Sequence, residues 1–237
     1  MDIKKILPLI PARGGSKGVI NKNIYIIDQK PLIQYTIEAT LSSSLFSEVF
    51  VSTDSKEIAE VSLKLGASVP FIRPNNLAQD KSSSIDVIIH ALEWFETNQD
   101  RNFDYVLLLQ PTSPLRNSKD IINCLNLMEQ NPFVSTVVSV TEVSEPHPDK
   151  LFKINKNNII EPYIEKYNKP FEGRRQDLEK VYSRNGAIYL INVKHLLAKK
   201  LIYCGTTIPY QMPFERSVNI DSYNDLIIME ALLKHEK

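Results

Sequence analysis

The sequence is poor in cysteine and in long apolar runs, and it carries no net charge. It has two cysteines, Cys124 and Cys204, and no His or Cys pair at metal-ligand spacing, so neither a disulfide framework nor a structural zinc site is indicated. Lys and Arg number 28, as do Asp and Glu, which argues against a general nucleic-acid binder. Nowhere do about 18 apolar residues run together, so no membrane span is expected.

The first apolar run, Ile6–Ile10, is too short for a signal peptide and is soon followed by Arg13 and glycines. We therefore expect a cytoplasmic protein. The 237 residues suit one domain or one domain with an insertion, and 43% hydrophobic residues is an ordinary globular value.

Strand-like and helix-like segments alternate up to Val140. The expected strands are Ile6–Ile10, Glu48–Ser52, Ser68–Ile72, Tyr105–Leu109 and Phe133–Val140. The expected helices are Leu32–Leu41, Lys56–Leu65 and two that are capped by Ser84 and Ser118. This alternation predicts a Rossmann-like α/β fold with a mainly parallel central sheet and helices on both faces.

The pattern changes between Val140 and Gly186. Short strand-like runs occur at Leu151–Ile154 and Ile159–Ile164 without a good helix, before a strand at Gly186–Asn192 and a helix near Ser222–His235. We expect a core formed by residues 1–141 and 181–237 and a β-rich insertion at 142–180. Because no helix buries its apolar side chains, the insertion is expected to pack on a second copy as a dimerisation arm; a long surface excursion is the alternative.

One short loop combines glycine and positive charge. Pro11 to Asn23 reads PARGGSKGVINKN, with three of the chain's 7 glycines and the cations Arg13, Lys17 and Lys22. A loop of this kind after a strand suits bound phosphate. It is not a Walker A loop, since no Ser or Thr follows Lys17, and it could still be a glycine-rich turn with solvated lysines.

Polar residues follow other expected strands and should meet the loop at the same sheet edge. They are Ser52, Thr53, Asp54, Arg73, Asp80, Ser83, Ser84, Gln110, Thr112, Ser113 and Arg116. Asp54 and Ser84 could be only helix caps. The amide of Gln110 offers a donor and an acceptor together, which suits recognition of a nucleobase edge.

Taken in order, several motifs resemble the acylneuraminate cytidylyltransferases, or CMP-sialic acid synthetases. They are IPARGGSKG…KN, STD, RP…LA.D.SSS, LLQPTSPLR, NGAIY and NID…DL, and they cover nearly the whole chain. GGSKGVINKN is closer to this nine-carbon sugar group than to the enzymes that activate octulosonic acid. GRRQDLEKVYSRNGAIY looks more like the bacterial legionaminic-type branch.

The resemblance implies a nucleotide-diphospho-sugar transferase-like fold and a CTP-dependent nucleotidyltransferase. The anomeric hydroxyl of a nine-carbon 2-keto sugar acid would attack the α-phosphate of CTP and release pyrophosphate, for synthesis of bacterial surface glycans such as lipopolysaccharide or capsule. The alternatives are an octulosonic-acid or other sugar nucleotidyltransferase, and a nucleotide-binding protein without catalysis.

The resemblance also assigns residues. Catalysis falls to Arg13, Lys17, Lys22 and Asp221, and nucleotide binding to Ala12, Arg13, Gly14, Gly15, Ser16, Lys22, Asn23, Arg73 and Ser83. Sugar binding falls to Gln110, Asn185, Tyr189 and Tyr203, with Arg175 and Lys150 as candidates for the sugar carboxylate. Lys150 could come from the other protomer of a homodimer.

This chain has only one of the two carboxylates with which the family typically binds magnesium. Where Asp-Ile-Asp is typical, the chain has Asn219, Ile220 and Asp221, so Asp221 is the expected Mg²⁺ ligand and Asn219 a neutral one. Asp221 could instead be a turn residue before the last helix. His90 and His195 are expected to be packed or surface residues, and His147 not to touch a ligand.

Overall fold

The computed structural model describes residues 1–143, 145–164 and 174–235. Its main sheet has six strands in the order β10-β6-β9-β5-β1-β4. Their bounds are β1 Ile6–Pro11, β4 Phe50–Ser52, β5 Tyr105–Leu108, β6 Thr136–Val143, β9 Val181–Asn192 and β10 Thr207–Gln211. β9 is antiparallel to β5 and β6, and the other pairs are parallel. The expected mainly parallel sheet is confirmed.

Helices cover both faces of this sheet. The α-helices are α1 Leu32–Leu41, α2 Lys56–Lys64, α3 Ser84–Gln99, α4 Ser118–Gln130, α5 Val193–Lys199 and α6 Tyr223–His235. Successive side chains of β1 point to opposite faces. Ile6 and Ile10 join the core formed with α1, α2 and α4, whereas Leu7 and Leu9 join the core formed with α3 and α5. This alternation explains why the run is apolar at every position.

Several local expectations were wrong. Ser83, not Ser84, caps α3, and Asn117, not Ser118, caps α4 in a capping box with Asp120. The expected strand Ser68–Ile72 makes only isolated bridges to the β4 region. α5 and β10 were not expected; β10 contains a proline, which a strand at the sheet edge tolerates.

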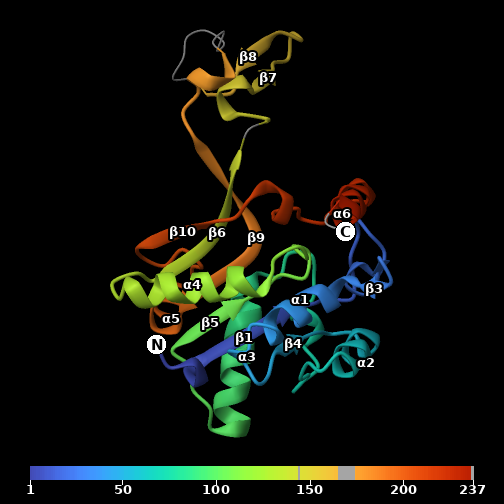
Figure 1. Ribbon diagram of the computed structural model, residues 1–237, viewed down its shortest axis with the longest axis vertical. Coiled ribbons are helices and arrows are strands. Elements are labelled where there is room, and N and C mark those ends of the chain that lie inside the picture. The colour runs from blue at the N-terminus through green and yellow to red at the C-terminus, as the bar shows by residue number, and fades with distance from the viewer. Residues whose placement is uncertain (144, 165–173, 236–237) are drawn as a thin grey trace.

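A separate apolar cluster fixes the chain's last helix beside the glycine-rich loop. The hairpin of β2 (Ile26–Ile27) and β3 (Lys30–Pro31) lies next to α6 (Figure 1). Val19 and Ile27 pack there against Ile220 and Met229. The cluster therefore holds the segment around Asp221 against the loop that follows β1.

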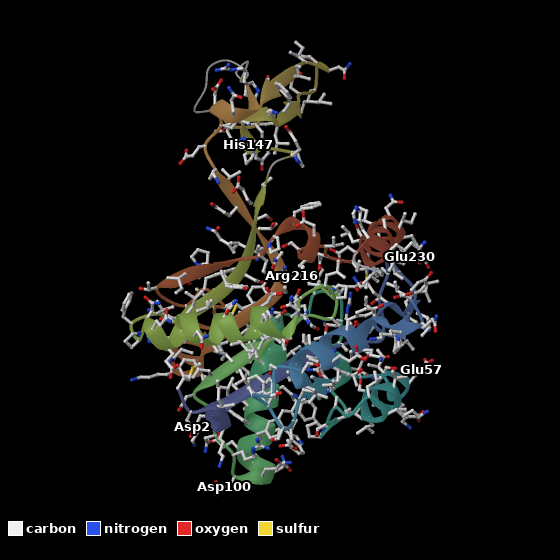
Figure 2. All side chains as sticks on the ribbon, in the orientation of Figure 1. Asp2, Glu57, Asp100, His147, Arg216 and Glu230 are labelled. Carbon is white, nitrogen blue, oxygen red and sulfur yellow. The ribbon has the colours of Figure 1, made fainter. Side chains whose placement is uncertain are left out.

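The segment between β6 and β9 projects from the core as an arm (Figure 1). It carries a hairpin of β7 (Phe152–Ile154) and β8 (Ile160–Pro162). Figure 2 places His147 in the arm, away from the core, where it is buried and its Nε2 lies 3.0 Å from the carbonyl oxygen of Glu179.

Short 3-10 helices complete the fold. They are η1 Ile3–Lys5, η2 Lys22–Ile24, η3 Asn75–Leu77, η4 Pro148–Lys150, η5 Arg175–Asp177 and η6 Phe214–Arg216. Within the part of the chain that the structure describes, no helix is both long and apolar enough to span a bilayer.

Candidate active site

A cleft of about 480 Å³ opens at the carboxyl edge of the sheet, and we call it the loop compartment. It is formed by the loop after β1, the segment that leads into α3, the turn after β5 and the segment before α6. Its polar lining residues are Arg13, Ser16, Lys17, Lys22, Asn23, Arg73, Gln79, Asp80, Ser82, Ser84, Gln110, Thr112, Asn219 and Asp221. The structure thus brings together the three cations of the loop, Arg73, Gln110, Asn219 and Asp221.

Carboxylates pair with the loop cations in this cleft. Arg13 Nη1 donates to Asp80 Oδ1 at 2.8 Å, and Lys17 forms an ion pair with the other oxygen of Asp80. These hydrogen bonds, from Lys17 and then from Arg13, lower the pKa of Asp80. Lys22 Nζ donates to Asp221 Oδ1 at 3.0 Å and to the carbonyl oxygen of Ile220 at 2.6 Å. An anionic ligand would therefore compete with Asp80 and Asp221 for these cations.

Gly18 sets the approach between the loop and the segment before α6. A Cβ on Gly18 would lie 2.0 Å from the carbonyl oxygen of Asp221, which no real side chain could tolerate. On the other side of that segment, the Ile220 amide donates to the Thr112 carbonyl at 2.7 Å. Three segments distant in the sequence are thus closely joined, and the third loop glycine is required by packing.

Arg73 and Asn23 are buried, and each has polar side-chain atoms without a hydrogen-bond partner. Nε and Nη2 of Arg73 and Oδ1 of Asn23 have no hydrogen-bond partner, and both side chains line the loop compartment. Burial lowers the pKa of Arg73, although Asp54 lies 3.8 Å away. Asp54 is not the cap of α2, which is Ser55; it accepts from the Gly14 amide at 3.0 Å. Buried unpartnered donors are costly, and a bound anion would satisfy those of Arg73.

A second hollow of about 310 Å³ adjoins the first, and we call it the strand compartment. It is lined by Ser84, Gln110, Arg184, Asn185, Gly186, Tyr189, Ile202 and Asn219. Ser84, Gln110 and Asn219 line both compartments. Gly186 has a φ of +76°, and a Cβ there would lie 3.0 Å from Gln110 Oε1, so a glycine lets β9 turn close to this amide.

The predicted sugar-binding residues of β9 differ in how freely they face this hollow. Asn185 uses its amide inside the protein, since its Oδ1 accepts from Ser139 Oγ at 2.6 Å and its Nδ2 donates to Ser217 Oγ at 2.9 Å. Tyr189 is buried, and burial followed by the nearby Tyr203 raises its pKa to about 12. Tyr189 is therefore a neutral phenol near neutral pH.

Arg116 holds two backbone segments of the strand compartment together. From the sequence, we expected only that it lies at the sheet edge. Its buried guanidinium donates from Nε to the Ala187 carbonyl at 2.8 Å and from Nη2 to the Gln110 carbonyl. Burial lowers its pKa to about 9, with Asp120 opposing the shift. Arg116 thus ties the turn after β5 to β9 and fixes the backbone of Gln110.

Some predicted residues lie elsewhere. Ser83 serves as a helix cap, and its neighbours Ser82 and Ser84 line the cleft instead. Lys150 pairs with Glu145 on the arm of the same chain. Residue 175 begins η5, but the side chain of Arg175 lies outside the described part of the structure. Ala12 is buried, and neither compartment is lined by Gly14, Gly15 or Tyr203.

The segment before α6 offers oxygen atoms to a cation. Asn219 Nδ2 donates to Asp221 Oδ2 at 2.5 Å, and Ser113 Oγ donates to Asn219 Oδ1 at 3.4 Å. Over the described ranges, no group of three or more His, Cys, Asp or Glu side chains is placed to hold a metal. One carboxylate and one amide fit Mg²⁺ that takes its remaining ligands from phosphate and water.

Comparison with known proteins agrees with this architecture. Residues 7–221 match a family described as "Cytidylyltransferase". The chain is 37% identical to a pseudaminic acid cytidylyltransferase of Campylobacter jejuni and 37% identical to a CMP-N,N'-diacetyllegionaminic acid synthase of Legionella pneumophila, each time over 97% of both chains. A structure of CMP:2-keto-3-deoxy-manno-octonic acid synthetase complexed with CTP shares the fold, with a TM-score of 0.67, 19% identity and coverage of 98% of this chain and 100% of that one.

The match with the family covers most of the chain and includes the glycine-rich loop, the turn after β5 and the segment that ends at Asp221. The cytidylyltransferase resemblance expected from the motifs is confirmed. The chain belongs to the cytidylyltransferase family.

Proposed function

We propose that this protein transfers CMP from CTP to the anomeric hydroxyl of a nine-carbon 2-keto sugar acid. The observation that carries the proposal is the pair of adjoining compartments, one lined by four cations and the other by a single cation, that share Gln110 and Asn219. Full-length relatives named for pseudaminic and legionaminic acids support this substrate class. Their equal identity does not favour either acid.

In the proposed reaction, the anomeric hydroxyl releases its proton to solvent and its oxygen forms a bond to the α-phosphorus. The bond from that phosphorus to the bridging oxygen breaks, and pyrophosphate leaves with the bonding electron pair. Negative charge moves toward the leaving group, so positioning and cationic stabilisation supply most of the catalysis. Arg13, Lys17 and Lys22 would exchange their carboxylate partners for phosphate oxygens. Arg73 would offer its unpartnered donors to the nucleotide.

Asp221, with Asn219 as a neutral second donor, would hold Mg²⁺. When bound, the ion would neutralise part of the triphosphate charge. Lys22 already lies 3.0 Å from Asp221, so the carboxylate is held beside the cations that would face the phosphates. The family typically has a second carboxylate where this chain has Asn219. We therefore propose that phosphate and water oxygens complete the coordination of the ion.

We also propose that the arm of residues 142–180 forms a homodimer. Its large apolar side chains are exposed: Phe152 by 44%, Ile154 by 70%, Ile160 by 61% and Tyr163 by 60%. A second copy could cover them. Light scattering of the wild type against Ile154→Glu tests this: a dimeric mass that becomes monomeric in the variant is expected, and a monomeric wild type would contradict it.

The main test is a panel of four nucleoside triphosphates against neuraminic, legionaminic, pseudaminic and octulosonic acids, with pyrophosphate release as the readout. We expect release only with CTP, Mg²⁺ and a nine-carbon acid, a reaction that we place in the cytoplasm. Turnover without any 2-keto acid would indicate another nucleotidyltransferase. CTP binding without release for any acid would indicate a nucleotide-binding protein that lacks catalysis.

A further inference from the structure

Arg184 differs electrostatically from the other cations of the cleft. Arg13 and Lys17 pair with Asp80, and Lys22 pairs with Asp221. Arg184 forms no ion pair with any residue that the structure describes. Among the described residues, its guanidinium makes one hydrogen bond, a long one of 3.5 Å from Nη1 to Tyr203 Oη. A guanidinium without a carboxylate partner is thus present beside the reaction site.

The surroundings of Arg184 suit one anionic group. Of the eight residues that line the strand compartment, Arg184 is the one cation and none is Asp or Glu. The other polar groups are amides, a hydroxyl and the neutral phenol of Tyr189. An anion bound here would meet no like charge on the lining, whereas in the loop compartment it would face Asp80 and Asp221.

The backbone explains why Arg184 lies at this hollow. It pairs with Val140 in the β6–β9 ladder, next to an irregularity between Val138 and Val140. Two residues later, Gly186 adopts its positive φ. Bulges and glycines of this kind redirect strand side chains and occur next to active sites.

We propose that Arg184 binds the carboxylate of the sugar acid and thereby selects for 2-keto acids. This inference rests on the proposed function. A guanidinium matches a carboxylate with two parallel N–H···O bonds, which a lysine cannot reproduce. The carboxylate and the anomeric hydroxyl are carried by the same carbon of such an acid. Fixing the carboxylate therefore also orients the attacking oxygen.

This assignment replaces two earlier candidates for the carboxylate. Lys150 is paired with Glu145 on the arm, and the side chain of Arg175 is outside the described residues. Tyr203 becomes a positioning residue, because its hydroxyl accepts from Arg184. That hydrogen bond also raises the pKa of Arg184, so its charge is retained.

The test compares Arg184→Gln and Arg184→Lys with the wild type in steady-state assays and in binding assays with each acid in the presence of CTP. For Arg184→Gln we expect the KM of the acid to rise about 10- to 100-fold, as for loss of a hydrogen-bonded charge, with the KM of CTP unchanged. For Arg184→Lys, the KM of the acid should lie between the values of the wild type and Arg184→Gln, because lysine keeps the positive charge but not the two parallel N–H donors of the guanidinium. As a matched control, Lys180→Gln removes a nearby cation that already pairs with Glu142 and should change neither KM.

A substrate change makes the test specific for the carboxylate. With an acid whose carboxylate is converted to a carboxamide, wild type and Arg184→Gln should have the same kcat/KM. If the variant loses the same factor with acid and amide, or if Arg175→Gln or Lys150→Gln shows the predicted loss instead, the assignment is wrong while the proposed function stands. If the wild type neither binds nor turns over any acid, both fall.

Discussion

The two compartments show opposite ways of holding charge. In the loop compartment, Arg13, Lys17 and Lys22 are all paired with carboxylates, so a triphosphate must displace internal partners. In the strand compartment, the single cation Arg184 has no carboxylate on the lining. The first arrangement keeps many like charges together in the empty protein. The second leaves one charge ready for a ligand with one carboxylate.

This comparison predicts that the kinetic parameter changed by a substitution depends on the compartment in which the residue lies. Changes in the loop compartment should alter the kinetic parameters for CTP and Mg²⁺ and leave the KM of the acid. Substitutions of Arg184 should alter the KM of the acid and leave the kinetic parameters for CTP and Mg²⁺ unchanged. A variant that altered both equally would show that the two compartments act as one.

The largest effect is expected for Asp221→Ala. Removing the carboxylate that we propose as the Mg²⁺ ligand should lower Mg²⁺-dependent kcat by about 1,000-fold, which is typical for loss of a major electrostatic contact in an active site. Steady-state assays over a range of Mg²⁺ concentrations measure this. Asp221→Asn, which keeps the shape and one oxygen donor, is the matched control and should lose less. Substantial activity in Asp221→Ala would refute the metal assignment.

Gly18→Ala should come next. The new Cβ would meet the Asp221 carbonyl at 2.0 Å, so the loop or the segment before α6 must move. A displacement of about 1 Å in a reacting group can cost about 100-fold in rate. We expect a loss of that size in kcat, measured as pyrophosphate release, with a far-ultraviolet circular dichroism spectrum like that of the wild type. Activity within threefold of the wild type, a limit of about 0.7 kcal/mol in barrier height, would contradict the close approach.

Asp80→Asn should have a smaller effect of the opposite sign. It removes the carboxylate that competes with phosphate for Arg13 and Lys17. Because exposed ion pairs are weak, the KM of CTP should fall by about two- to fivefold. Since the pKa of Asp80 is lowered, the carboxylate stays charged as pH rises, and the competition is lost only as pH falls through that lowered value. A higher KM in the variant would mean that Asp80 orients these cations for the ligand.

The smallest effect is expected for Asn219→Asp. A second carboxylate beside Asp221 should lower the Mg²⁺ concentration for half-maximal rate by about threefold, by adding charge to the ion site. Titration of the rate with Mg²⁺ at saturating CTP measures this. An unchanged half-maximal concentration would show that position 219 does not contact the ion. Asn219 also accepts from Ser113, so the melting temperature should be compared in parallel.

Helix caps show how local prediction can miss by one residue. Ser83 and Ser84 are adjacent and chemically identical, as cap formers go, and the backbone angles of the first turn decide which of them accepts the amide hydrogen bond. β10 and α5 were not predicted because edge strands and short helices depend on packing more than on their own sequence. The apolar runs of β1 and β5 were predicted because all their residues except the half-buried Pro11 and Tyr105 are buried.

The sequence by itself determined the alternation of strands and helices, the glycine-rich and cationic character of the loop after β1, and the place of Gln110 at the same sheet edge. These properties follow from local periodicity and residue chemistry. The tertiary structure decided which charges meet: Arg13 and Asp80, 67 residues apart, form a pair, and Gly18 touches the backbone of Asp221. It also left Arg184 without a carboxylate partner among the described residues. Contacts of this kind depend on how distant segments pack, and no pattern along the chain encodes them.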